Sequence, residues 1–169
     1  IVSCPALDGV YPGGLCEGWR AAGSPDFSRN EDTAYRLYGK YSQHVTASTA
    51  GQGVQQAVSV CPGSVYSLSA TLFMVSGAVR VQICDGSALY RRIHPVTGSG
   101  FITVSLENWK AYSSSVTVQI IQDGACPAEF YLDSVQIAGG ARVKPFTVGK
   151  SADKLWNWRH KKNRRLPIK

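Results

Sequence analysis

The chain has 169 residues, of which 17% are charged, below the roughly 25% usual in globular proteins, while Gly, Ser, Val and Tyr are abundant. This length fits one domain with a hydrophobic core of its own, and no run approaches the roughly 18 apolar residues of a membrane-spanning helix. The start at "IVSC" without an initiator Met fits a trimmed, exported chain, so we expect an extracellular or cell-surface location.

The net charge of +7 is unevenly divided along the chain. Residues 1–140 hold eight Lys and Arg against ten Asp and Glu, whereas residues 141–169 hold ten basic residues and one acid, Asp153. We therefore predict two units, a body at 1–140 and a basic arm at 141–169. Such an arm suits an anionic partner or an acidic groove on another protein.

The elements of the body are predicted in chain order from hydrophobic alternation. Residues 6–32 are expected to be ordered loops, and regular pairing is expected to begin at "TAYRLYG" and "YSQHVTAS". Period-two alternation then predicts strands at "VQQAVSV", "VYSLSATLFM", "AVRVQIC", "ALYRRI", "FITVSL" and "SVTVQIIQ". Gly-containing turns separate them about every ten residues. The body is therefore predicted to be an all-β antiparallel sandwich.

The last predicted strand, "EFYLDSVQI", changes phase within itself. Phe130 and Leu132 are apolar at one parity, and Val135 and Ile137 at the other. A β-bulge near Asp133 would let both pairs face the core.

The five cysteines form no CxxC pair and have no His at metal-ligand spacing, which favours disulfides over zinc. Counting strand crossings places Cys61 and Cys84 at the same end of the sandwich, so we predict that these two pair. Cys4 and Cys16 are predicted to form a local bridge, and Cys126 is left over or replaces either of them. The alternative is that some are small buried hydrophobic residues.

Several segments resemble one known family when they are taken in order. These are Trp19 and the stretches "YGKYSQHV", "GVQQAVSVCPGSVYSLSATL", "VRVQI", "WKAYSSSVTVQI" and "FYLDSVQI". Over residues 17–138 they resemble carbohydrate-binding modules built on the galactose-binding-like jelly roll, the kind found beside cellulases and xylanases. The resemblance implies a jelly-roll sandwich that binds a glycan or a cell-surface polysaccharide.

The resemblance also implies a structural calcium ion, held by carboxylates from an opening strand and from the closing motif. Here "LDGVYPGGLCEGW" takes the place of the opening strand, and Ser134 stands where a second acid is common. Asp133 is the one calcium ligand that is carried over. No other cofactor is expected.

Sugar binding requires an aromatic ring for stacking and amide or guanidinium groups for the hydroxyls. The polar strand faces offer Gln55 and Thr117 as well as the candidates we select, which are Arg80, Gln82, Tyr90, Trp109, Tyr112 and Gln119. Two alternatives stay open. Trp109 could be a core anchor, and Arg80 with Gln82 could form a solvated sheet face.

Enzymatic interpretations are disfavoured. His44, His94 and His160 form no cluster in the sequence, and no GxSxG, HExxH, P-loop or GxGxxG motif is present. We therefore expect a non-catalytic protein.

The arm combines aromatic and basic residues, which can fill an apolar groove and then bind an anionic surface. Its candidate docking residues are Trp156, Trp158, Arg159, Lys161, Lys162, Arg164 and Arg165. A solvated linker is the alternative. Neighbouring protein subunits or a polymer are preferred to nucleic acid as partners, because the slightly acidic body contains no nucleic-acid-binding motif. The second hypothesis for the whole chain is thus a structural subunit of a surface layer, filament or virion surface that docks through its arm.

Overall fold

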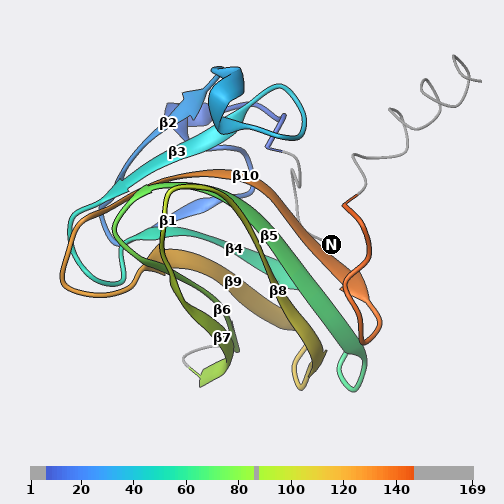
Figure 1. Cartoon of the computed structure of the whole chain (residues 1–169). Coiled ribbons are helices and arrows are strands. Elements are labelled where there is room, and N and C mark those ends of the chain that lie inside the picture. Colours follow the sequence, from blue (N-terminus) through green and yellow to red (C-terminus); the bar gives the residue numbers. More distant parts are fainter. Residues whose placement is uncertain (1–6, 86–87, 147–169) are drawn as a thin grey trace, which may run out of the picture.

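The computed structural model describes residues 7–85 and 88–146, with the backbone alone described for 88–95. Ten strands form two five-stranded antiparallel sheets (Figure 1). The A sheet has the order β1-β4-β9-β6-β7, and the B sheet has the order β2-β3-β10-β5-β8. The predicted all-β sandwich is therefore confirmed. The arm residues from Trp156 to Arg165, and Cys4, lie outside the described residues.

The elements of the described chain have the following bounds. The strands are β1 (Arg20–Ala22), β2 (Asp26–Asn30), β3 (Ser42–Ala47), β4 (Gly53–Ser59), β5 (Val65–Ser76), β6 (Val79–Asp85), β7 (Ala88–Val96), β8 (Gly100–Lys110), β9 (Ser115–Gln122) and β10 (Ala128–Gly139). Two short 3-10 helices, η1 (Pro12–Gly14) and η2 (Thr33–Tyr35), lie between them in the first third of the chain.

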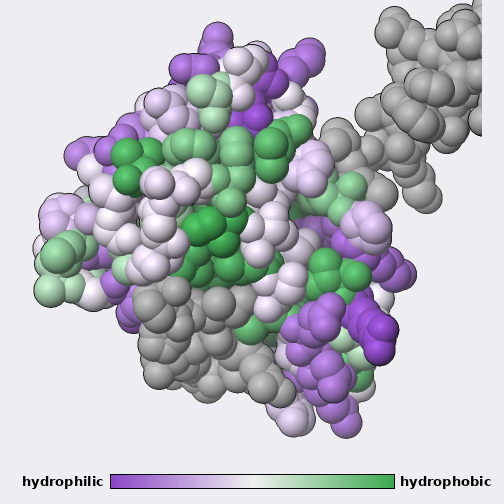
Figure 2. All heavy atoms as spheres, viewed as in Figure 1, coloured by the Kyte–Doolittle hydropathy of each residue, from purple (hydrophilic) through white to green (hydrophobic). Residues whose placement is uncertain are grey.

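The core lies between the two sheets. From the A sheet it receives Val54, Val81 and Ile120, and from the B sheet it receives Leu72 and Phe130, all fully buried. Burying a side chain of this size contributes about 1.5 to 3 kcal/mol. Figure 2 shows hydrophilic side chains over β2 and beside the ends of β5 and β10, with hydrophobic side chains between them.

The predicted bulge in β10 is present. Leu132 pairs with Leu72 and Ser134 pairs with Thr71, so that Asp133 is the extra residue and has no partner across the ladder. Asp133 is completely buried. The phase change in the sequence therefore located the bulge correctly.

A second bulge, in β8, determines the position of Trp109. Tyr66 pairs with Trp109 and Leu68 pairs with Leu106, so two residues of β8 lie opposite one residue of β5. One of the two, Asn108, has φ 53°, a left-handed conformation that Asn tolerates better than most side chains. The bulge turns both Leu106 and Trp109 into the core.

The first third of the body differs from the prediction. Two strands, β1 and β2, replace the expected loops, and "TAYRLYG" forms η2 and a loop instead of a strand. Both strands lie at the edge of their sheet. An edge strand pairs on one side only, so it can be short and carries little hydrophobic periodicity.

The predicted Cys61–Cys84 disulfide is wrong, because both thiols are free. Cys84 pairs with Thr117, and Thr117 pairs with Ala57 near the end of β4, which Cys61 follows. The prediction that Cys61 and Cys84 lie at the same end of the sandwich is therefore correct. However, β9 lies between β4 and β6. Two strand spacings separate the backbones by about 10 Å, whereas a disulfide joins Cα atoms up to about 7 Å apart.

The other predicted bridge stays a prediction. Cys16 is buried in the core at 1% exposure, while its expected partner, Cys4, lies outside the described residues. Cys126 is exposed and its thiol is free. Within the described ranges, no helix is long and apolar enough to cross a membrane.

Candidate functional site

Three glutamines align across the outer face of the A sheet. Gln55 on β4 pairs with Gln119 on β9, and Gln119 pairs with Gln82 on β6. Residues paired in an antiparallel sheet point to the same face, so the three side chains form one row perpendicular to the strands. Their inward neighbours, such as Val118 and Ile120, are fully buried in the core.

The row is a continuous chain of hydrogen bonds, which we call the amide ladder. The Nε2 of Gln82 donates to the Oε1 of Gln119 over 2.5 Å, and the Nε2 of Gln119 donates to the Oε1 of Gln55 over 2.8 Å. The Nε2 of Gln55 then donates to the carbonyl oxygen of Ala21 on β1 over 3.3 Å. The ladder thus spans four strands and holds each amide in a defined orientation.

Cys84 supports the centre of the ladder. Its thiol donates to the Oε1 of Gln119 over 3.4 Å and accepts from the Nε2 of Gln82 over 3.5 Å. Burial raises the pKa of this thiol, which keeps it protonated and able to donate. The sequence suggested a disulfide for this residue. Cys84 follows Gln82 by two residues on β6, and this spacing was the signal that could have placed it on the same polar face.

Arg80 lies on the same face as Gln82, two residues away along β6. Its guanidinium forms an ion pair with Asp123 over 3.0 Å, and both side chains are largely buried. The pair neutralises the positive charge of Arg80. At the other edge of the sheet, Arg20 of β1 pairs with Gln55 and is exposed, so the outer face is polar and carries a positive charge beside the ladder.

The aromatic candidates lie in three different places. Trp109 is 2% exposed and its ring stacks on Tyr66 at 5.1 Å, so it belongs to the core, where a sugar ring cannot reach it. Tyr112 is 71% exposed in the turn that leads into β9. The side chain of Tyr90 lies outside the described part of the chain. The structure therefore brings Arg80, Gln82 and Gln119 together, and removes Trp109 from the group.

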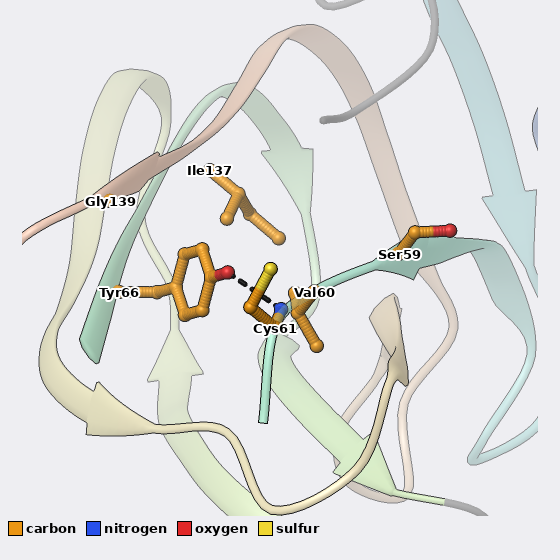
Figure 3. Close-up of a pocket in the computed structure, with 6 residues that line it drawn as sticks. All are labelled: Ser59, Val60, Cys61, Tyr66, Ile137 and Gly139. Carbon is orange, nitrogen blue, oxygen red and sulfur yellow. Dashed lines mark hydrogen bonds between the residues drawn. The ribbon is translucent and has the colours of Figure 1, made fainter. Parts of the chain in front are cut away.

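A separate cavity of about 300 Å³ lies between the ends of β4 and β10. It is lined by Ser59, Val60, Cys61, Tyr66, Ile137 and Gly139 (Figure 3). The hydroxyl of Tyr66 accepts a hydrogen bond from the backbone N–H of Cys61 over 2.8 Å, so this polar group is engaged within the cavity wall. No side chain of the amide ladder lines this cavity, and the ladder is the better candidate for recognition.

Several solved structures that share this fold are carbohydrate-binding modules. The module TmCBM61, determined in complex with β-1,4-galactotriose, aligns with TM-score 0.61 at 14% identity, over 82% of this chain and 97% of that one. The CBM22-1 xylan-binding domain of Paenibacillus barcinonensis Xyn10C aligns with TM-score 0.60 at 20% identity, over 82% and 93%. This chain has the jelly-roll fold of carbohydrate-binding modules.

The same fold also occurs in another setting. The enzymatically active part of tailspike protein 4 from bacteriophage CBA120 aligns with TM-score 0.59 at 12% identity, over 82% of this chain and 21% of that one. Sequence comparison adds no assignment, since no family model and no curated protein matches the chain. The family resemblance in the sequence is thus confirmed at the level of the fold.

Asp133, the expected calcium ligand of this jelly roll, faces hydrogen-bond donors. Its two carboxylate oxygens accept from the backbone N–H of Tyr38 over 3.2 and 3.4 Å. Asp8 likewise accepts from the N–H groups of Lys40 and Tyr41. Among the described residues, no three acidic, His or Cys side chains gather to hold a metal. These carboxylates therefore do not fit a calcium cage as they stand, and calcium binding by Asp133 stays a prediction.

Burial raises the pKa of Asp133 to about 6, above its ordinary value of 3.8. Backbone N–H groups of Leu37 and Tyr38 lower this pKa, while the negative charge of Asp8 raises it. Because the pKa is raised, the folded state keeps a proton that the unfolded chain has already released. The stability from this proton is full below pH 4 and is lost as the pH rises through 6.

We expect Asp133→Asn to remove this pH dependence. A shift of about two pKa units corresponds to about 3 kcal/mol, so the wild-type chain should lose that much more unfolding free energy than the variant between about pH 4 and 7. Urea unfolding at several pH values measures the difference. Parallel stability profiles for the two proteins would show that Asp133 ionises normally.

Proposed function

We propose that the chain is a non-catalytic, extracellular module that binds a polysaccharide on the outer face of the A sheet. The amide ladder is the observation that supports this proposal. It crosses four strands at about 4.8 Å intervals and holds its amides in a line. Gln82 is only 8% exposed, so a ligand that lies across the strands would meet donors and acceptors mainly at Gln119 and Gln55.

The ladder keeps hydrogen-bonding capacity for a ligand. A primary amide has two N–H donors and an oxygen that accepts twice. Within the described residues, Gln119 and Gln55 each use one N–H in the ladder, and Gln55 accepts one hydrogen bond. Sugar hydroxyls both donate and accept, so they can engage the remaining positions. Because the ladder holds the amides in place, binding costs less side-chain entropy.

The face combines uncharged amides with an exposed arginine. The three ladder amides are uncharged, and Arg80 is neutralised by Asp123. Arg20 of β1, which pairs with Gln55 and is exposed, adds a guanidinium that can donate to a sugar hydroxyl or to a carboxylate. We expect Tyr112, exposed in the loop between β8 and β9, to provide a ring for stacking on a sugar at the rim. TmCBM61 was determined with β-1,4-galactotriose, and CBM22-1 is a xylan-binding domain. Galactan and xylan are therefore suitable probes.

Affinity electrophoresis with soluble xylan, β-1,4-galactan and polygalacturonate tests the proposal. We expect the chain to be retarded by at least one of the three polysaccharides. Retardation by none of them would contradict the proposal.

The alternative function, a structural subunit of a surface layer, filament or virion surface, depends on the arm. Residues 147–169 of the arm lie outside the described residues, so this alternative stays a hypothesis. Removal of residues 150–169 followed by measurement of oligomer size tests it, because only an assembly subunit should change its oligomeric state.

A further inference from the structure

The outer face of the B sheet carries a row of aromatic side chains that the proposed function does not use. Tyr131 on β10 pairs with Phe73 on β5, and Phe73 pairs with Phe101 on β8. Tyr35 of η2 lies flat on Tyr131, with ring centroids 4.2 Å apart and planes 3° apart. We call these four residues, Tyr35, Phe73, Phe101 and Tyr131, the aromatic platform.

The rings of the platform contact one another in a continuous array. Phe73 meets Tyr35 edge to face at 5.0 Å and meets Phe101 in the same way at 5.0 Å. Even so, Phe101 remains 37% exposed and the nearby Val75 remains 40% exposed. Large exposed apolar side chains that gather in one place are typical of an interaction surface. Within the described residues, nothing covers them.

Acidic side chains border the platform. Burial raises the pKa of Tyr131, and the negative charges of Glu129 and Asp32 raise it further. Asp26 of β2 pairs with Thr46 of β3, and Thr46 pairs with Glu129 of β10. Asp26 and Glu129 therefore lie in one row across the sheet, two residues along β10 from Tyr131. Glu129 contacts His44 at 2.9 Å, whereas Asp26 and Asp32 are exposed. The surface thus combines aromatic rings with negative charge.

The described chain ends close to this surface. The ring of Phe146 contacts the ring of Tyr38 at 4.8 Å, and Tyr38 follows Tyr35 by three residues. Figure 1 shows η2 and its following loop over the sheet that contains β3 and β10. Ten residues separate Phe146 from Trp156, a span of at most about 35 Å. The aromatic part of the arm can therefore reach the platform of its own chain.

The sequence of the arm matches the surface in both respects. Trp156 and Trp158 provide rings for the platform, and the cations from Arg159 to Arg165 provide charge opposite to that of Asp26, Asp32 and Glu129. A tether of this length gives a high effective concentration, which favours docking within one chain over docking between chains.

We propose that the aromatic platform is the docking surface for the chain's own arm, residues 154–165. This goes beyond the proposed glycan binding, because it uses the opposite sheet and other residues. The tryptophans provide a direct reporter. Trp19 and Trp109 are 6% and 2% exposed, so a change in the accessibility of tryptophan to a soluble quencher reports mainly on Trp156 and Trp158.

The test measures acrylamide quenching of tryptophan fluorescence in the full chain and in two platform variants, Tyr35→Ala and Phe101→Ala. We expect low quenching in the wild type and a several-fold increase, with a shift of the emission to longer wavelength, in each variant. Tyr112→Ala is the matched control, since it removes an exposed tyrosine in the loop between β8 and β9, outside the platform. It should leave the quenching unchanged. Circular dichroism shows whether each variant is folded.

Two results would overturn the proposal. If the wild type and both platform variants are quenched equally, the arm does not use the platform. If instead the wild type forms oligomers at higher concentration, and Tyr35→Ala abolishes them, the platform binds the arm of a neighbouring copy and not its own. A monomer with protected tryptophans supports the proposal. Glycan binding by the A sheet is measured separately and can fail independently.

Discussion

Glycan affinity is expected to fall about 50-fold when Gln119 is replaced by alanine. Gln119 is the central member of the amide ladder, where it donates to Gln55 and accepts from Gln82 and Cys84. In the proposed site, its removal takes away contacts with the ligand and also releases both neighbouring amides. Loss of hydrogen bonds of this kind costs about 1 to 3 kcal/mol, and each 1.4 kcal/mol corresponds to about tenfold in affinity.

Isothermal titration calorimetry with the polysaccharide that binds the wild type measures this effect. Ser105→Ala on β8 is a suitable control, because Ser105 is an exposed small polar residue on the outer face of the B sheet. It should bind like the wild type. Unchanged affinity in a folded Gln119→Ala variant would show that the ligand binds elsewhere, and the proposed site would then be wrong.

The strand pattern of the body could be predicted because its strands bury one face and expose the other. Val116, Val118 and Ile120 alternate with Thr117 and Gln119, and this alternation survives in the structure. The same reasoning located the bulge at Asp133, because the apolar positions on either side of it differ in parity. The three glutamines were identified as polar-face residues, but their alignment depends on register. Register follows from which strands are neighbours, which the sequence does not state.

Strand order also explains the errors. The prediction placed Cys61 and Cys84 at one end of the sandwich, and only the position of β9 between β4 and β6 excludes the bond. In β8, the apolar positions change parity between Leu106 and Trp109, as they do between Leu132 and Val135 in β10. The predicted strand "FITVSL" ended at Leu106, so this signal was not used and the bulge at Asn108 was missed. Its consequence is that Trp109, predicted as a sugar-stacking candidate, faces the core.

Trp109→Ala is therefore expected to destabilise the fold by about 3 to 5 kcal/mol, the usual loss when a large buried aromatic side chain is removed. The variant leaves a cavity beside Tyr66, on which the indole ring stacks. Typical domains are stable by about 5 to 15 kcal/mol, so this change removes a large part of the total. Thermal and urea unfolding measure it. Tyr112→Ala, at the exposed tyrosine three residues later, should change stability by less than about 0.5 kcal/mol.

A second substitution at this position distinguishes packing from hydrogen bonding. The indole Nε1 of Trp109 is buried and has no hydrogen-bond partner in the described structure. Trp109→Phe keeps most of the apolar surface and removes this N–H, so it should cost much less than Trp109→Ala. If both variants stay as stable as the wild type and lose glycan binding, Trp109 contacts the ligand and its burial is not its main role. If stability falls with side-chain size, the bulge at Asn108 serves to place this tryptophan in the core. Trp109 is then not a sugar contact, and the amide ladder on the A sheet remains the proposed binding site.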